Sequence, residues 1–238
     1  MPALTVWSVC VGSKYPIGYV YALQEAVAKN LSTPHRFRCI TEHSIPGVET
    51  VDPVEDWAGW WSKFNLFASS SAPSIYFDLD VVITGKLDYL VPYAYQSFPQ
   101  LSAPANWARS GHGGIQSSVM AWLGTWDAPF FKVAREWPGT VDVDGYRTLG
   151  GVRYWGDQEY LWKMLGDRWT RLPRIYSYKY DCRDRRNLPR DMAVCVFHGE
   201  PKPVDVEDEW LLPSTSILRN HIKSSTGNGS KGVLNVTD

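Results

Sequence analysis

Ser74-Ile-Tyr-Phe-Asp78-Leu79-Asp80-Val-Val-Ile83 is an apolar run that contains two carboxylates one residue apart. Its β-branched and aromatic residues, bounded by Pro73 and Gly85, predict a buried strand. A buried ionised group needs a cation, strong donors or the open end of a sheet to compensate it. Residues i and i+2 of a strand share a face and lie roughly 6.6 Å apart. A slight turn would therefore let Asp78 and Asp80 bind one divalent cation. An alternative remains open at this point, in which Asp80 starts a turn and Asp78 caps a loop.

Length and composition indicate a globular protein. The chain has 238 residues, 44% of them hydrophobic and 21% charged, which suffices for a sizeable core in one domain with appendages. A formal net charge of −1 provides no overall field for nucleic acid or an anionic membrane. No apolar run approaches the roughly 18 residues of a membrane helix. Without a leader, a Cys-x-x-Cys pair or a disulfide pattern, we expect a reducing, cytoplasmic setting for the four cysteines, which are Cys10, Cys39, Cys182 and Cys195.

The beginning of the chain predicts a βαβ unit, with a strand over Leu4–Val11, a helix over Ile17–Leu31 and a strand over His35–Thr41. The first turn of such a unit commonly receives a nucleotide at the carboxyl end of the sheet. Val11 and Gly12 are therefore candidate ligand contacts. Only one glycine of a Gly-rich fingerprint is present, so no nicotinamide or flavin site is inferred. Gly12 as a plain turn residue remains an equal alternative.

The aromatic segment Trp57–Phe67 predicts a helix. Helical spacing places Trp60, Phe64 and Phe67 on one face, which we expect to pack in the core. Lys63 lies on an adjacent face, one helix before the acidic strand, where it could hold a phosphate. A solvated lysine is the alternative.

Further elements follow in the second half of the chain. Ser117 and Ser118 interrupt a predicted strand with small polar side chains, which suits a strand that approaches a ligand. Asp157 and Gln158 begin a helix, where an acid can cap free amides or hold sugar hydroxyls. The predicted elements are strands over Leu101–Trp107, Ile115–Trp122, Tyr176–Cys182 and Ala193–Phe197, a mobile loop over Arg109–Gly114, and helices over Asp127–Trp137 and from Asp157.

The C-terminal part repeats the pattern of an apolar strand that ends in a metal-competent side chain. His198 closes the strand, and Gly199 and Lys202 follow it. From Ser214 onward, Ser, Thr, Gly and Asn dominate the composition. We therefore expect a domain over residues 1–212 and a flexible extension over 213–238, with at most a short helix near Ile217–Ile222.

Four of these segments, in this order, resemble motifs of the family 8 glycosyltransferases, the glycogenin-like and galactosyltransferase-like enzymes with a type A fold. The resemblance covers roughly residues 4–203. Gln116-Ser117 stands where an Asn-Ser pair is usual, and the spacing from His198 to Lys202 is shorter than in the best-known members. The segments are Tyr76-Phe-Asp-Leu-Asp-Val-Val-Ile-Thr-Gly-Lys-Leu, Ser117-Ser-Val-Met-Ala-Trp, Asp157-Gln158 and His198-Gly-Glu-Pro-Lys202-Pro.

This resemblance implies a single-domain α/β type A fold, a Rossmann-like mixed sheet flanked by helices. It implies a hexosyltransferase that moves a sugar from a nucleoside diphosphate sugar, with UDP as the expected nucleotide, to an unknown acceptor with retention of configuration. Asp78, Asp80 and His198 would hold Mn²⁺, or Mg²⁺, which stabilises the leaving diphosphate. Asp157 and Gln158 would form the catalytic pair. The implied donor contacts are Val11, Gly12, Lys63, Asp78, Ser117, Ser118, Gly199 and Lys202.

Two other readings remain. The chain could be a carbohydrate-binding or scaffold protein of the same fold without turnover, since its 12 tryptophans offer surfaces for sugars. A sugar nucleotidyltransferase shares a similar layout but would have a Gly- and Arg-rich first loop, of which Val11-Gly-Ser-Lys14 is a poor version. No nucleic-acid partner and no transmembrane segment are expected.

Overall fold

The computed structural model describes residues 3–57, 59–97, 101–107, 114–124, 147–149, 152–184 and 188–227. The helix predicted over Asp127–Trp137 lies outside these residues, as does the loop predicted over Arg109–Gly114 apart from Gly114 itself. No helix in the described part of the chain has the length and apolarity needed to cross a bilayer.

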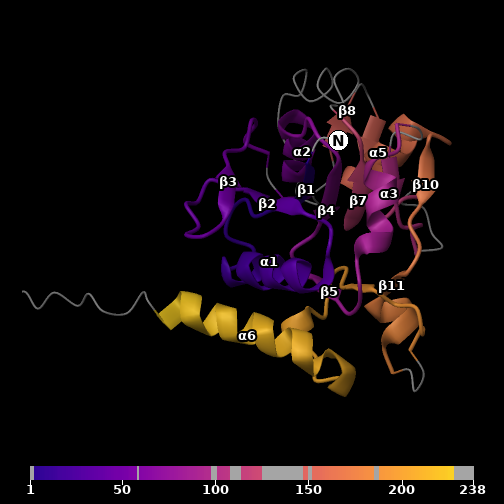
Figure 1. Cartoon of the computed structure of the whole chain (residues 1–238). Coiled ribbons are helices and arrows are strands. Elements are labelled where there is room, and N and C mark those ends of the chain that lie inside the picture. Colours follow the sequence, from indigo (N-terminus) through magenta and orange to yellow (C-terminus); the bar gives the residue numbers. More distant parts are fainter. Residues whose placement is uncertain are drawn as a thin grey trace, which may run out of the picture.

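The central element is a seven-stranded sheet in the order β10-β6-β7-β4-β1-β2-β3 (Figure 1). β1 pairs in parallel with β2 and β4, so the predicted βαβ opening is confirmed. β7 runs antiparallel to both of its neighbours, β4 and β6. The strands are β1 (Leu4–Val9), β2 (His35–Ile40), β3 (Glu49–Val51), β4 (Ser74–Phe77), β6 (Leu101–Ala103), β7 (Val119–Trp122) and β10 (Trp169–Arg171).

Side chains that alternate along the central strands supply two separate cores. Val6 and Ile75 face one core, whereas their chain neighbours Trp7 and Tyr76 face the other. This period of two is the pattern of strands buried on both faces. The first core contains helix α1 (Gly18–Asn30). The second contains the 3-10 helix η1 (Gly59–Phe64) and the helices α2 (Asn65–Ser69) and α5 (Asp157–Leu165).

The acidic stretch is two strands, not one. β4 ends at Phe77, and Asp78-Leu79-Asp80 turns the chain into β5 (Val81–Ile83), which belongs to a second sheet in the order β11-β12-β5. The Val81 amide donates to the Asp78 carbonyl across this turn. The single strand predicted over this stretch is therefore wrong at its centre, because the two carboxylates lie at a corner between sheets.

The second sheet contains β11 (Ile175–Ser177) and β12 (Val194–Val196), and the short strands β8 (Arg147–Leu149) and β9 (Val152–Tyr154) form a hairpin. The strand predicted over Tyr176–Cys182 ends early, because Tyr178–Cys182 forms a helical turn with the Ser177 hydroxyl accepting from the Tyr180 amide. Remaining short elements are α3 (Val91–Ala94) and the 3-10 turns Asp88–Leu90, Pro203–Asp205 and Glu209–Leu211.

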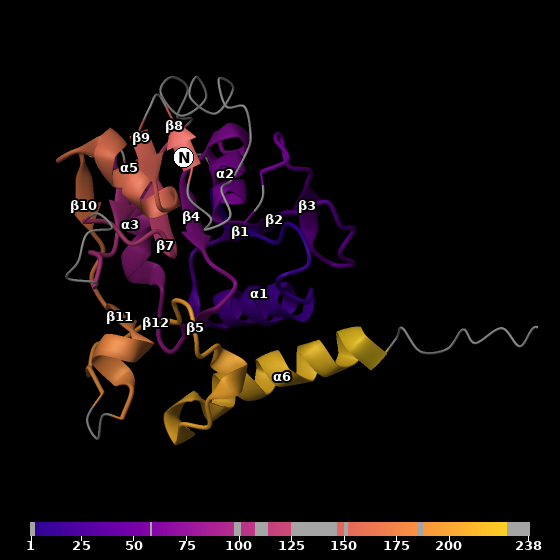
Figure 2. The same ribbon diagram turned by 180° about the vertical axis from the view of Figure 1, so that it is seen from behind.

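Helix α6 (Leu212–Gly227) packs against α1, so that α1 lies between the sheet and α6 (Figures 1 and 2). The contact is close at Gly18, where an added Cβ would lie 2.7 Å from the backbone of His221 and Ile222. Thr215 and Leu218 of α6 are buried. Most of the segment expected to be a flexible extension is therefore a packed helix. The residues after 227 lie outside the described part.

Candidate functional site

A pocket of about 720 Å³ opens at the carboxyl ends of β1 and β4. It is lined by every residue that the sequence indicated as a catalytic, donor-binding or metal-binding residue except Ser117, which is buried and accepts a hydrogen bond from Lys63. Strand pairing explains the convergence. The antiparallel partner of β4 is β7, so Ser118, just before β7, lies beside Asp78, whose amide donates to the Ser118 carbonyl at 2.8 Å. Likewise, β12 runs antiparallel to β5, so its end, near His198, lies beside Asp80 at the start of β5.

The inner part of the pocket is a buried ion cluster around Lys63. The Lys63 ammonium Nζ lies 3.1 Å from Asp78 Oδ1 and 3.0 Å from Asp157 Oδ2. It also donates to the Ser117 hydroxyl at 3.0 Å, and that hydroxyl donates to Asp157 Oδ2 at 2.5 Å. The Tyr76 hydroxyl donates to Asp78. We call Lys63, Asp78, Asp157, Ser117 and Tyr76 the inner cluster.

The carboxylates of the inner cluster favour the protonated forms of Lys63 and Tyr76. Burial alone would lower the pKa of the Lys63 ammonium, but the carboxylates of Asp157 and Asp78 raise the pKa above its usual range. Burial and the charge of Asp78 raise the pKa of the Tyr76 phenol, which therefore stays protonated as a donor. The chain thus supplies its own cation, Lys63, to the buried Asp157 and the partly buried Asp78.

The outer part of the pocket holds a second lysine and carboxylate. Lys202 Nζ lies 2.7 Å from Asp80 Oδ2, and the Tyr15 hydroxyl donates to the same oxygen at 2.7 Å. Lys202 Nζ is also 3.1 Å from the Tyr15 oxygen. We call Lys202, Asp80 and Tyr15 the outer cluster. Burial and the nearby charge of Asp78 raise the pKa of Asp80, and Lys202 opposes this shift.

His198 lies between two aromatic rings. Trp107 stacks on its imidazole with ring centroids 5.8 Å apart and planes 6° apart, and Tyr180 stacks at 5.6 Å and 21°. Its Nε2 hydrogen-bonds to the Ser177 hydroxyl at 2.7 Å. Burial, together with the positive charges of Lys179 and Lys202, lowers the pKa of His198, which favours the neutral imidazole.

The pocket contains side chains of the types that bind divalent metal ions. Asp78, Asp80 and His198 line one pocket, and two carboxylates with a neutral imidazole suit Mn²⁺. Their arrangement is not that of a preformed metal site, because no group of three His, Cys, Asp or Glu side chains among the described residues is placed to hold a cation. Instead, the ammonium groups of Lys63 and Lys202 form ion pairs with Asp78 and Asp80.

The remaining sequence candidates line the same pocket. Val11 and Gly12 follow β1, and the Gly12 amide donates to Glu42 Oε1 at 2.7 Å. Gly12 has a φ of +74°, so it occupies the left-handed region of a turn. Gln158 follows Asp157 at the start of α5, and Gly199 follows His198.

Several residues that line the pocket were not predicted as site residues from the sequence. Tyr15 follows the first strand closely enough that its position could have been anticipated, but its bond to Asp80 joins residues 65 apart in the chain. Trp60 was expected in the core, and this prediction is wrong, because 42% of its surface is exposed. The segment is a 3-10 helix, in which residues three apart align. Trp61 therefore stacks on Phe64 in the core at 5.6 Å, and Trp60 faces the pocket.

Solved structures with a similar fold include several glycosyltransferases. An active-site mutant of LgtC has a TM-score of 0.64 and 15% identity over 91% of this chain and 95% of its own. The galactosyltransferase LgtC in complex with donor and acceptor sugar analogs has a TM-score of 0.59 and 14% identity over the same shares. The apo form of the glycosyltransferase GlyE from Streptococcus pneumoniae TIGR4 has a TM-score of 0.62 and 13% identity over 94% of this chain and 64% of its own.

No protein-family model and no curated protein matches the sequence. At identities of 13–15%, the structural likeness establishes a shared fold. The predicted α/β fold, with a mostly parallel mixed sheet flanked by helices as in type A glycosyltransferases, is confirmed.

Proposed function

We propose that this chain is a glycosyltransferase that moves a hexose from a nucleoside diphosphate sugar, with UDP as the nucleotide, to an acceptor. The observation that carries the proposal is the pair of lysines in one pocket, Lys63 held by Asp78 and Asp157, and Lys202 held by Asp80. Breaking a sugar–phosphate bond leaves negative charge on a diphosphate, and fixed cations stabilise that charge most in a pocket of low dielectric. The similarity to glycosyltransferases in fold supports the same function.

The chain's own residues have distinct roles in this proposal. Lys202, on the outer side, exchanges Asp80 for a donor phosphate, while Lys63 keeps Asp78 and Asp157 in place beneath the sugar. Val11 and Gly12 lie at the nucleotide end, where the first βα turn of such sheets binds nucleotides. Ser117 and Ser118 line the sugar side, and Gly199 leaves the backbone accessible beside His198.

The proposal includes Mn²⁺, or Mg²⁺, bound by Asp78, Asp80 and His198 once Lys202 leaves Asp80. When bound, this cation supplies Lewis-acid stabilisation of the leaving diphosphate. Removing divalent ions with EDTA should then abolish turnover, and Mn²⁺ should restore it. Transfer that is unaffected by EDTA would contradict a metal and would leave the neutralisation of the diphosphate to Lys202.

We assign Asp157 and Gln158 to the reacting face of the sugar, with retention of the anomeric configuration. A double displacement needs a carboxylate close to the anomeric carbon, whereas a front-face route needs only groups that stabilise an oxocarbenium-like state. If Asp157 is the nucleophile, Asp157→Asn should abolish transfer while donor still binds. A measurable residual rate would favour the front-face route. An inverted linkage seen by NMR would contradict the assignment.

The direct test of the activity is to incubate the chain with Mn²⁺ and a panel of nucleotide sugars and follow diphosphate release. Release from one UDP-hexose with transfer or slow hydrolysis of the sugar supports the proposal. Sugar binding without turnover of any donor would instead support a carbohydrate-binding protein of this fold. Formation of a nucleotide sugar and pyrophosphate from a nucleoside triphosphate would support a nucleotidyltransferase. The cytoplasmic setting remains a prediction, and none of the four cysteines forms a disulfide bond.

A further inference from the structure

Two tryptophans form a stacked pair on one wall of the pocket. The indole rings of Trp60 and Trp155 have centroids 5.3 Å apart and planes 26° apart. Trp60 belongs to the 3-10 helix η1, and Trp155 belongs to the segment between β9 and α5, so two distant parts of the chain build the pair. Both residues line the pocket.

The exposure of Trp60 is unusual among its neighbours. Trp57 and Trp61 in the same stretch are 7% and 1% exposed, whereas Trp60 is 42% exposed. An exposed indole forgoes the favourable burial of a large apolar surface, which its two neighbours obtain. An aromatic surface retained at the wall of a pocket that also contains charged side chains is the arrangement of a binding site.

Each tryptophan is close in sequence to one member of the inner cluster. Trp60 is three residues before Lys63 in a 3-10 helix, so the two side chains align on one face. Trp155 is two residues before Asp157, and its amide donates to Glu159 Oε2 at 2.8 Å, which fixes this segment at the start of α5. Lys63 and Asp157 contact each other at 3.0 Å. The two indoles therefore come from the same two chain segments as the buried ion pair that we placed beneath the transferred sugar, and they line the same pocket.

We infer that Trp60 and Trp155 are a platform for the acceptor, and that the acceptor presents a sugar ring. The inference rests on the proposed function and names the substrate class of its second site. A pyranose has a face of C–H groups that packs on an indole, and its hydroxyls need polar partners at the rim. Gln158 and Lys14 line the pocket beside the pair, and Lys14 Nζ lies 5.9 Å from the Trp60 ring centroid.

A sugar fits this position better than the donor's base does. We placed the base near Val11 and Gly12, after β1, and the sugar above Lys63 and Asp157, from which the two tryptophans are three and two residues away along the chain. Lys14, two residues after Gly12, also lies beside Trp60, so the platform is within reach of the nucleotide end as well. Binding of the base is therefore the competing outcome of the test.

The test titrates lactose, maltose and cellobiose into the wild-type chain, Trp60→Ala and Trp155→Ala, by calorimetry in the presence of UDP and Mn²⁺. UDP is titrated separately into each variant. Trp162→Ala is the matched control, because Trp162 on α5 is 39% exposed and does not line the pocket. Trp60→Leu and Trp155→Phe are added in case an alanine variant does not fold, which thermal melting checks.

We expect at least one disaccharide to bind the wild type, and each platform variant to weaken that binding roughly tenfold. The dissociation constant of UDP should change by less than about twofold, and Trp162→Ala should match the wild type in both titrations. The inference is overturned if the variants bind the disaccharide normally, if UDP weakens as much as the disaccharide does, or if none of the three sugars binds the wild type. UDP binding and donor turnover by the wild type test the proposed function separately.

Discussion

The two lysine–carboxylate clusters of the pocket differ in how firmly the fold holds them. Lys63 rises from a 3-10 helix packed in the core, its side chain is 8% exposed, and it joins two carboxylates. Lys202 lies on the segment after β12, its side chain is 16% exposed, and it joins one carboxylate. A buried cation with two anionic partners cannot leave without exposing both charges. The comparison therefore indicates that Lys63 stays in its ion pairs, whereas Lys202 can exchange Asp80 for another anion.

The largest expected effect concerns the stability of the inner cluster. Lys63→Met should lower the free energy of unfolding by about 3–5 kcal/mol, because Asp157, whose side chain is 7% exposed, would remain buried without its cation, and the partly buried Asp78 would lose its ion pair. Urea unfolding measures this loss. The matched control is Lys163→Met, whose lysine pairs with Glu159 at 3.0 Å with its side chain 39% exposed. That exposed pair should contribute only about 0–1 kcal/mol. Equal losses in the two variants would refute a structural role for Lys63.

Lys202→Met should have the next largest effect. Its loss of stability should be smaller than that of Lys63→Met, about 1–3 kcal/mol, because Asp80 keeps the Tyr15 hydroxyl as a donor. The affinity for UDP should fall roughly tenfold or more and become less sensitive to salt, since a charge-assisted contact to phosphate is lost. Calorimetric titration at two salt concentrations measures both. An unchanged UDP affinity would remove Lys202 from the donor site.

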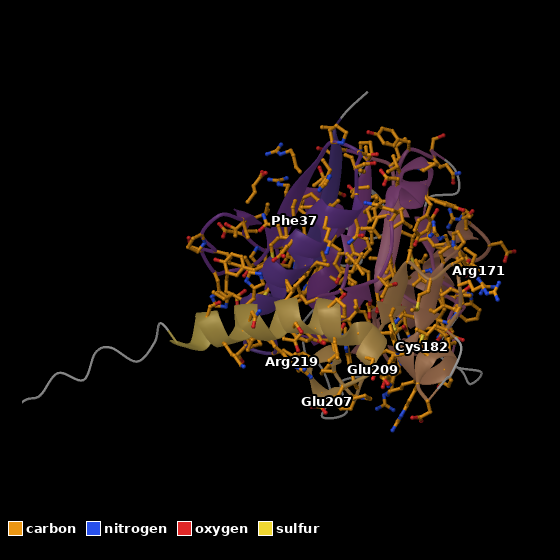
Figure 3. The ribbon with its side chains drawn as sticks, turned by 60° about the horizontal axis from the view of Figure 1, so that its bottom comes forward. Phe37, Arg171, Cys182, Glu207, Glu209 and Arg219 are labelled. Atoms are coloured by element: carbon orange, nitrogen blue, oxygen red, sulfur yellow. The ribbon has the colours of Figure 1, made fainter. Side chains whose placement is uncertain are left out.

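Arg219 should be a positioning residue for the outer cluster. Arg219 lies on α6 (Figure 3). Its guanidinium donates to the carbonyls of Val204 and Val206 at 3.0 Å each, and thereby holds the segment just after Lys202. Arg219→Met should lower stability by about 1–2 kcal/mol and weaken UDP binding without affecting the inner cluster. Asn220→Met, at the exposed neighbouring position, is the control. A purely structural role would lower stability and leave the UDP affinity intact.

The smallest effect concerns the charge of His198. Its NMR titration should show a pKa below 6.5, because burial and the charges of Lys179 and Lys202 disfavour the imidazolium. In Lys202→Met the pKa of His198 should rise, since one of the two neighbouring cations is gone. A pKa above 6.5 in the wild type would contradict this environment.

The order of strands and helices could be predicted from the sequence, because each element follows from the local spacing of apolar residues. The βαβ opening, a strand that begins at Ser74 and the helix that begins at Asp157 appear in the structure as predicted. The corner at Asp78–Asp80 was not predicted, because the apolar run continues on both sides of it. One long buried strand and two short buried strands in different sheets have the same pattern of apolar residues in the sequence.

The partners of the site residues could not be predicted, since they join distant parts of the chain. Lys202 contacts Tyr15 across 187 residues and Asp80 across 122. The sequence predicted a divalent cation for Asp78 and Asp80, which stays a prediction, whereas the lysines that contact these carboxylates in the structure were not anticipated as their partners. Trp60 faces the pocket because Gly59–Phe64 is a 3-10 helix and not an α-helix. The amino-acid composition of this segment does not distinguish the two kinds of helix.

The central claim is that this pocket is the donor site of a glycosyltransferase. The most direct measurement is a crystal structure of the chain with UDP and Mn²⁺. The account predicts the diphosphate in the pocket within hydrogen-bonding distance of Lys202 Nζ, the Lys202–Asp80 contact opened, the inner cluster unchanged and the base near Val11 and Gly12. UDP bound outside the pocket, or a diphosphate that contacts neither lysine, would contradict it.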